Sequence, residues 1–204
     1  MDKELEERLV RLSQRLGEML ETSFHAFRRL TEESIREVEK VKGEVRQDSA
    51  ELTNYLVSRG SATENGKEWI KPCVSIASSF ERMSYNIEGI VERLKMMNHE
   101  EILFSDRAVR ELNDIFQEAM DLLAILPDLI VTRNKLLAQQ IGEKVRVVFK
   151  MANFYCEEHE DRLIQGICMP KSSPSYLGTL ESLKGVLTHI LEVSGKIATL
   201  SAMA

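Results

Sequence analysis

The chain contains few residues that interrupt helices or cross-link a fold. It has 4 prolines and 10 glycines in 204 residues, and several of the glycines lie inside stretches that otherwise favour helix, so the composition predicts long helices. The three cysteines, Cys73, Cys156 and Cys168, are too few and too irregularly spaced for a disulfide framework. We therefore expect a cytoplasmic protein with reduced thiols.

Long apolar runs and a surplus of basic residues are also absent. No segment approaches the roughly 18 consecutive apolar residues of a membrane-spanning helix, and residues 1–8 are charged and lack the apolar core of a secretory signal. Acidic residues outnumber basic ones by 33 to 27, which gives a net charge of −6, whereas duplex-DNA binders usually show a basic surplus or stripe. We expect a protein that is at most peripheral to a membrane and that does not bind nucleic acid.

Apolar residues recur at steps of three and four along most of the chain, which is the spacing of one helical stripe. This pattern predicts six helices, over residues 5–30, 35–58, 70–94, 106–126, 137–167 and 176–197. Residues 59–66 and 169–175 are rich in glycine, proline and small polar residues and are predicted to be loops, and Pro127 is expected to bend or break the chain. Because there is almost no strand signal, the sequence predicts an all-α bundle.

The order of the predicted helices repeats. Two long helices, a loop with glycine or proline, and a helix with an apolar seam occur twice, ending first near Leu94 and then near Ile197. Any two amphipathic helices match at heptad spacing by chance. The evidence for an internal repeat is therefore the shared order and length of the three elements in each half. We expect two domains, residues 1–98 and residues 99–204, each a three-helix bundle.

The third predicted helix contains a short signature. Its residues 80–90 read FERMSYNIEGI and resemble the helix-borne signature of the PhoU family, which reads Glu-Arg-x-x-Asp. Glu81 and Arg82 match this pattern, whereas Tyr85 occupies the position of the acid. The resemblance extends to nearly the whole chain, because PhoU proteins are similar in being tandem three-helix bundles.

The corresponding segment of the second half is residues 191–197. Glu192 matches, but Val193 replaces the arginine and Lys196 replaces the second acid. The resemblance implies that intact motifs hold iron, zinc or other cations through two carboxylates four residues apart, which point the same way from a helix. Since each pair here lacks its second acid, we expect no resident cofactor, with Glu81 and Glu192 left as weak candidate ligands for a divalent or iron ion.

What the resemblance implies about function is control of inorganic phosphate transport. A regulatory or adaptor protein of this kind contacts a phosphate transporter or its sensor kinase at the cytoplasmic face. We expect recognition of a partner helix through apolar and paired charged groups, and a homodimer on the same grounds. The candidate partner-binding residues are charged residues near the two signatures, although a solvated helix face explains them equally well: Glu81, Arg82, Glu88, Glu92 and Glu192.

A second hypothesis is a metal-binding helical bundle with other ligands. Cys156, His159 and Glu160 lie within one helical turn, but zinc needs three or four such ligands and no second Cys or His pair has suitable spacing. The alternative interpretation is a buried thiol and a core-edge histidine beside a solvated acidic face.

We expect no enzymatic activity from this sequence. The remaining histidines, His25, His99 and His189, are separated in the sequence and lack matching cysteine or acid partners, so a nucleophile and base pair cannot be assembled from the sequence. A glycine-rich loop that could bind phosphate groups is also absent.

Overall fold

The computed structural model of the chain describes residues 2–62 and 67–200. Within these residues the chain is helical and forms no strand, which confirms the predicted all-α class. A short 3-10 turn, η1 (Pro170–Ser172), precedes the last helix. The six long helices are α1 (Lys3–Arg29), α2 (Glu32–Ala62), α3 (Lys67–His99), α4 (Asp106–Thr132), α5 (Lys135–Ile164) and α6 (Ser173–Leu200). Over the same part of the chain, none of them is both long enough and apolar enough to cross a bilayer.

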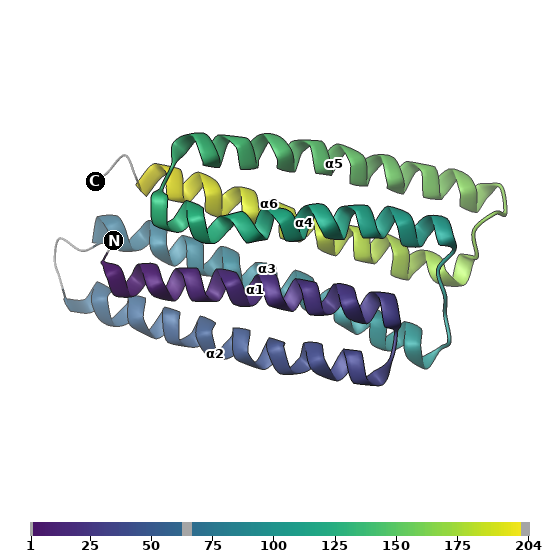
Figure 1. Cartoon of the computed structure of the whole chain (residues 1–204), viewed down its shortest axis with the longest axis horizontal. Helices are drawn as coiled ribbons and strands as arrows, with labels where there is room; N and C mark the ends of the chain where they lie inside the picture. Colours follow the sequence, from purple (N-terminus) through teal and green to yellow (C-terminus); the bar gives the residue numbers. More distant parts are fainter. Residues whose placement is uncertain (1, 63–66, 201–204) are drawn as a thin grey trace.

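The helices lie lengthwise in an elongated bundle (Figure 1). Helices α1 and α4 lie side by side in the middle of the view, α3 and α6 lie behind them, and α2 and α5 form the two outer edges. The most extensive packing is between α3 and α6, and α1 also packs on α4, whereas α2 and α5 pack on helices of their own half. The first three helices and the last three are therefore joined through the central helices α1, α3, α4 and α6.

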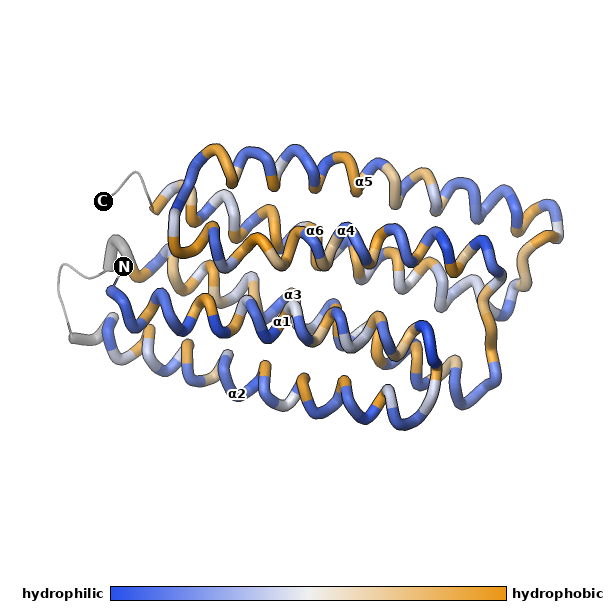
Figure 2. Tube along the Cα trace, viewed as in Figure 1, coloured by the Kyte–Doolittle hydropathy of each residue, from blue (hydrophilic) through white to orange (hydrophobic). Residues whose placement is uncertain are grey.

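The core runs continuously through both halves. On α1 the predicted stripe is buried, with Leu5, Leu9 and Leu16 fully inaccessible to solvent, and burying one such side chain contributes about 1.5–3 kcal/mol. Figure 2 shows apolar residues recurring along each helix between hydrophilic ones. Aromatic rings connect α1 to α4, since the Phe116 ring centroid lies 5.3 Å from that of Phe24 and 5.5 Å from that of Phe27.

Helices α1 and α4 have the same length and equivalent ends. Each has 27 residues. The side chain of Asp2 caps α1 and that of Ser105 caps α4, each accepting a hydrogen bond from the backbone N–H three residues later. Each helix then ends at a residue in the left-handed conformation, Leu30 with φ 47° and Arg133 with φ 51°. The repeat seen in the order of the helices thus extends to the chemistry of their termini.

Of the bend or break predicted at Pro127, the break does not occur, and the predicted helix end at residue 126 is wrong. Helix α4 continues through Pro127 to Thr132. A proline inside a helix costs about 3 kcal/mol because it removes one hydrogen bond and crowds the preceding turn, but Leu126, Leu129 and Ile130 around it are fully buried, and this packing offsets the cost. The chain turns instead at Arg133, and the side chain of Asn134 caps α5.

The loop boundaries also differ from the prediction. Helix α5 ends at Ile164 rather than residue 167, because Gly166 adopts φ 70° and the N–H of Ile167 bonds to the carbonyl of Arg162, the geometry of a Schellman helix end. Ile167, predicted on the apolar stripe, is therefore exposed. Helix α6 starts at residue 173 inside the predicted loop 169–175, and α2 extends to residue 62 inside the predicted loop 59–66, of which residues 63–66 lie outside the described residues.

Candidate functional site

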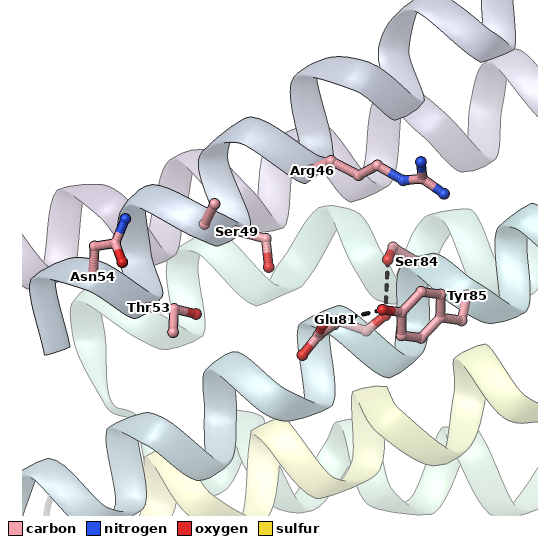
Figure 3. Close-up of a pocket in the computed structure, with 8 residues that line it drawn as sticks. Arg46, Ser49, Thr53, Asn54, Glu81, Ser84 and Tyr85 are labelled. Carbon is pink, nitrogen blue, oxygen red and sulfur yellow. Dashed lines mark hydrogen bonds between the residues drawn. The ribbon is translucent and has the colours of Figure 1, made fainter. Parts of the chain in front are cut away.

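A polar groove between α2 and α3 contains the first signature residue. Its cavity has a volume of about 480 Å³. Figure 3 shows the side chains that approach it from the two helices. Helix α2 contributes Arg46, Ser49, Ala50, Thr53 and Asn54, and α3 contributes Glu81, Ser84 and Tyr85. Apart from one alanine, every lining side chain can hydrogen-bond.

Tyr85 occupies the position where the family pattern has a second acid, and it binds the first one. The Tyr85 hydroxyl donates to Glu81 Oε1 at 3.1 Å (Figure 3), and this hydrogen bond and the carboxylate charge raise the pKa of Tyr85. At the end of the groove, Arg46 donates to the Glu88 carboxylate at 3.2 and 2.9 Å. The groove thus presents the Glu81 carboxylate among neutral hydroxyl and amide groups, with the paired Arg46 guanidinium at its end.

The second signature acid, Glu192, is surrounded by cationic and hydrogen-bonding groups. Its Oε2 lies 3.2 Å from Arg82 Nη2, 3.2 Å from His189 Nδ1 and 3.7 Å from Lys196 Nζ, and it accepts a hydrogen bond from Ser79 Oγ at 2.9 Å. Burial alone would raise the pKa of Glu192, but the hydrogen bonds from His189 and Ser79 and the charge of Lys196 outweigh it, so the pKa is lowered. This carboxylate is ionised and already neutralised by side chains of the chain itself.

The structure therefore brings together Arg82 of the first signature and Glu192 of the second. Lys196 joins the same contact, because its Nζ donates to Ser79 Oγ at 2.8 Å and to the Ser75 carbonyl at 3.2 Å. Glu81 instead lines the groove on the α2 side of α3. The sequence identified these residues, but their pairing across α3 and α6 follows only from the fold.

Sequence analysis missed a buried polar cluster that connects α4, α5 and α6. Arg162 donates two hydrogen bonds to the Glu111 carboxylate, at 3.0 and 2.7 Å, and the Tyr176 hydroxyl donates to Glu111 Oε2 at 2.5 Å. Arg107 Nε donates to the same carboxylate at 3.0 Å. Burial and the hydrogen bond to Glu111 raise the pKa of Tyr176 well above its usual range. Glu111 lies on the apolar stripe of α4. A charged residue on an apolar stripe is the feature of the sequence that could have indicated this buried cluster.

The three residues of the metal hypothesis have separate surroundings. His159 is 1% exposed, its Nε2 lies 2.8 Å from Ser173 Oγ, and its ring stacks on Tyr176 with centroids 4.4 Å apart. Burial and the nearby Arg162 lower its pKa. Cys156 is half-buried against the core and burial raises its pKa, while Glu160 is exposed. His159 thus belongs to the buried polar cluster.

Residues 9–94, from α1 to α3, match the family model of the PhoU domain. The chain contains a PhoU domain. Its fold extends over the whole chain, because the crystal structure of PhoU from Pseudomonas aeruginosa is similar to it with a TM-score of 0.86, covering 99% of this chain and 97% of that chain at 12% sequence identity. No match was found among curated proteins.

A resident cation of the kind that intact PhoU signatures imply does not fit these residues. In the PhoU domain, Glu81 faces a tyrosine hydroxyl rather than a second acid, and in the second half the charges of Arg82 and Lys196 occupy the surroundings of Glu192. In residues 2–62 and 67–200, no group of three or more His, Cys, Asp or Glu side chains is arranged to hold a metal ion.

The remaining predicted partner-binding residues lie further along α3 of the PhoU domain. Glu88 is largely covered and paired with Arg46. The Glu92 side chain is 61% exposed and pairs with Lys95 Nζ at 2.8 Å. Tyr85 is 56% exposed, so α3 presents an aromatic ring to solvent between Glu81 and Glu92.

Proposed function

We propose that this protein regulates inorganic phosphate transport by binding another protein through its helices. The match of residues 9–94 to the PhoU domain carries the proposal, and the whole-chain likeness to PhoU of Pseudomonas aeruginosa supports it. The proposed partner is a phosphate transporter or its sensor kinase, met at the cytoplasmic face. The protein acts as an adaptor without turnover, and a homodimer is part of the same proposal.

The α2–α3 groove is the proposed docking surface. An exposed tyrosine is a favourable anchor because it combines a large apolar ring with a hydroxyl, and Tyr85 stands at the edge of a groove lined with hydrogen-bonding groups. Glu81 and Glu92 are exposed on the same helix, and Arg82 is exposed at the α3–α6 contact, where it pairs with Glu192. A partner helix or loop that enters the groove gains hydrogen bonds from side chains that now face water.

Glu88 and Glu192 contribute differently in this proposal. Their carboxylates are engaged by Arg46 and by Arg82 with Lys196, respectively. A partner would have to break these contacts to bind either acid directly. We therefore propose that they shape the surface while the exposed residues of α3 bind the partner.

Co-purification from cells that naturally produce the protein tests this proposal. The wild type is expected to recover a phosphate permease or its sensor kinase in amounts that depend on external phosphate. Tyr85→Ala should reduce this recovery about tenfold, the loss typical of an aromatic anchor at an interface. Phe154→Ala is the matched control, because Phe154 is 54% exposed on α5. Failure of the wild type to recover a transport component, or equal recovery with Tyr85→Ala, would contradict the proposal.

A further inference from the structure

One end of the molecule carries an unusual apolar surface. The α3–α4 connection and the α5–α6 connection meet at this end (Figure 1), and in Figure 2 the α5–α6 connection is strongly hydrophobic. Four large apolar side chains form what we call the end patch: Leu103, Ile164, Ile167 and Met169, which are 73, 84, 66 and 66% exposed. Apolar side chains gathered in this way mark interaction sites more often than isolated ones do.

A cavity of about 320 Å³ opens within the end patch. Leu103, Ile167 and Met169 line it together with Phe104 and Tyr176. Its volume is at the lower end of the range for ligand pockets, enough for one large side chain. The end patch thus has the form of an anchor pocket surrounded by apolar contact area.

A buried histidine lies in the wall of the cavity. His159 lines it and is 1% exposed, and its Nδ1 is buried without a hydrogen-bond partner in the described part of the chain. Because solvent does not reach this atom, an inserted group would meet the ring of His159 rather than Nδ1. The rings of His159, Phe104 and Tyr176 in the lining therefore favour an aromatic side chain as the inserted group.

The surroundings of the end patch are acidic. Glu101, Asp106, Glu160 and Asp161 make no ion pair within the described residues. Of the nearby basic side chains, Lys171 pairs with Glu100, Arg107 with Glu111 and Glu158, and Arg162 with Glu111. Arg110 on α4, and Arg28 and Arg29 beyond Phe27, make no ion pair within the described residues, so unpaired acids outnumber unpaired bases at this end. The charge that remains for a partner is therefore negative.

We propose that the end patch binds a basic amphipathic segment of another protein, which inserts a tyrosine or tryptophan side chain into the cavity beside His159. Apolar residues of that segment cover the end patch, and its lysines or arginines face the acidic surroundings. The charges disfavour a second copy of this chain and an anionic membrane, since both would place negative charge against negative charge. The proposal goes beyond the phosphate role, because it uses none of the residues of the α2–α3 groove.

Selection from a random peptide library displayed on phage, with the full chain as target, tests the proposal. The selected peptides are expected to carry a net positive charge and at least one tyrosine or tryptophan. Leu103→Asp and Ile167→Asp should each weaken binding of those peptides about tenfold, the factor that corresponds to losing the burial of one large aliphatic side chain. Val147→Asp is the matched control, since Val147 is 59% exposed on α5. Replacing the aromatic residue of a selected peptide by leucine should also weaken binding.

Four results would overturn the proposal. They are a failure to select any peptide, selected peptides that are acidic or lack aromatic residues, equal binding by Leu103→Asp, and equal weakening by Val147→Asp. Two further measurements test the alternative occupants of the end patch. A dimer seen by sedimentation velocity and abolished by Leu103→Asp would assign the end patch to a second copy of the chain. Binding to phosphatidylserine vesicles that is abolished by Leu103→Asp would assign it to a membrane. None of these measurements depends on a phosphate transporter, so the two proposals can fail separately.

Discussion

Replacing Arg162 by methionine removes the charge that neutralises Glu111 in the interior. The two side chains are each 7% exposed and share two hydrogen bonds, at 3.0 and 2.7 Å. Breaking a buried ion pair by removing one partner costs about 3–5 kcal/mol, because the remaining charge stays buried. Arg107 still donates to Glu111 at 3.0 Å, so we expect a loss near the lower limit, about 3 kcal/mol.

A matched apolar variant distinguishes the cost of leaving a buried charge unpaired from the cost of lost packing. Replacing Glu111, Arg162 and Tyr176 together by leucine, methionine and phenylalanine removes both charges of the buried pair and the hydroxyl bonded to it, while keeping similar volumes; Arg107 keeps its contact with Glu158. We expect this triple variant to unfold within about 1 kcal/mol of the wild type, because apolar substitutes for a buried pair are often neutral or stabilising. Arg46→Ala, which breaks an exposed pair with Glu88, should cost less than about 1 kcal/mol.

Urea unfolding followed by far-UV circular dichroism measures all four proteins. The midpoint shift multiplied by the slope gives the difference in free energy of unfolding, provided the slope is unchanged. The reasoning is refuted if Arg162→Met unfolds within about 1 kcal/mol of the wild type. It is equally refuted if the triple variant is as unstable as that single variant, since the loss would then come from packing.

Three further outcomes are expected. Burial and Arg162 lower the pKa of His159, so below about pH 6.5 the unfolded chain gains a proton that the folded chain resists. The free energy of unfolding should therefore fall by up to about 1.4 kcal/mol per pH unit as the pH is lowered from there, and His159→Gln should lose this slope in urea titrations. Leu16→Ala should cost about 2–5 kcal/mol, measured the same way, because Leu16 is fully buried. Elemental analysis of protein purified without a tag should find no stoichiometric transition metal, and a stoichiometric ion lost in Cys156→Ser would support the metal hypothesis instead.

Helical periodicity predicted the architecture because it reports burial directly. The leucines of α1 recur every three or four residues, and such a stripe can be buried only on one side of a helix. The ends of the helices depend on weaker local signals. Gly166 ends α5 through its positive φ. Because Ile167, directly after this glycine, continues the spacing of the apolar stripe, the sequence prediction wrongly extended the helix to Ile167.

The candidate sites were less predictable because their contacts are remote in sequence. Glu111 takes its partners from positions 51 and 65 residues away, on two other helices. A charge on the apolar face of α4 indicated that some partner existed, but only the packing of α5 and α6 selects Arg162 and Tyr176. The end patch was missed because its residues were assigned to different elements. Ile167 was predicted on an apolar helix stripe and Met169 in a loop, and only the end of α5 at Ile164 leaves both side chains exposed.

The contacts of Glu192 show how side chains alone neutralise a carboxylate at the junction of α3 and α6. A carboxylate at the α3–α6 junction needs a positive partner, because an unpaired, partly buried charge is unfavourable. Here Arg82 and Lys196 supply it from both helices, and Ser79 completes the hydrogen bonding. Lys196 stands where the resemblance places an acid, and its ammonium group donates to Ser79 and to the Ser75 carbonyl of α3 while it lies 3.7 Å from Glu192. An acid at this position could not donate these hydrogen bonds and would repel Glu192, so Lys196 contributes to the packing of α6 on α3.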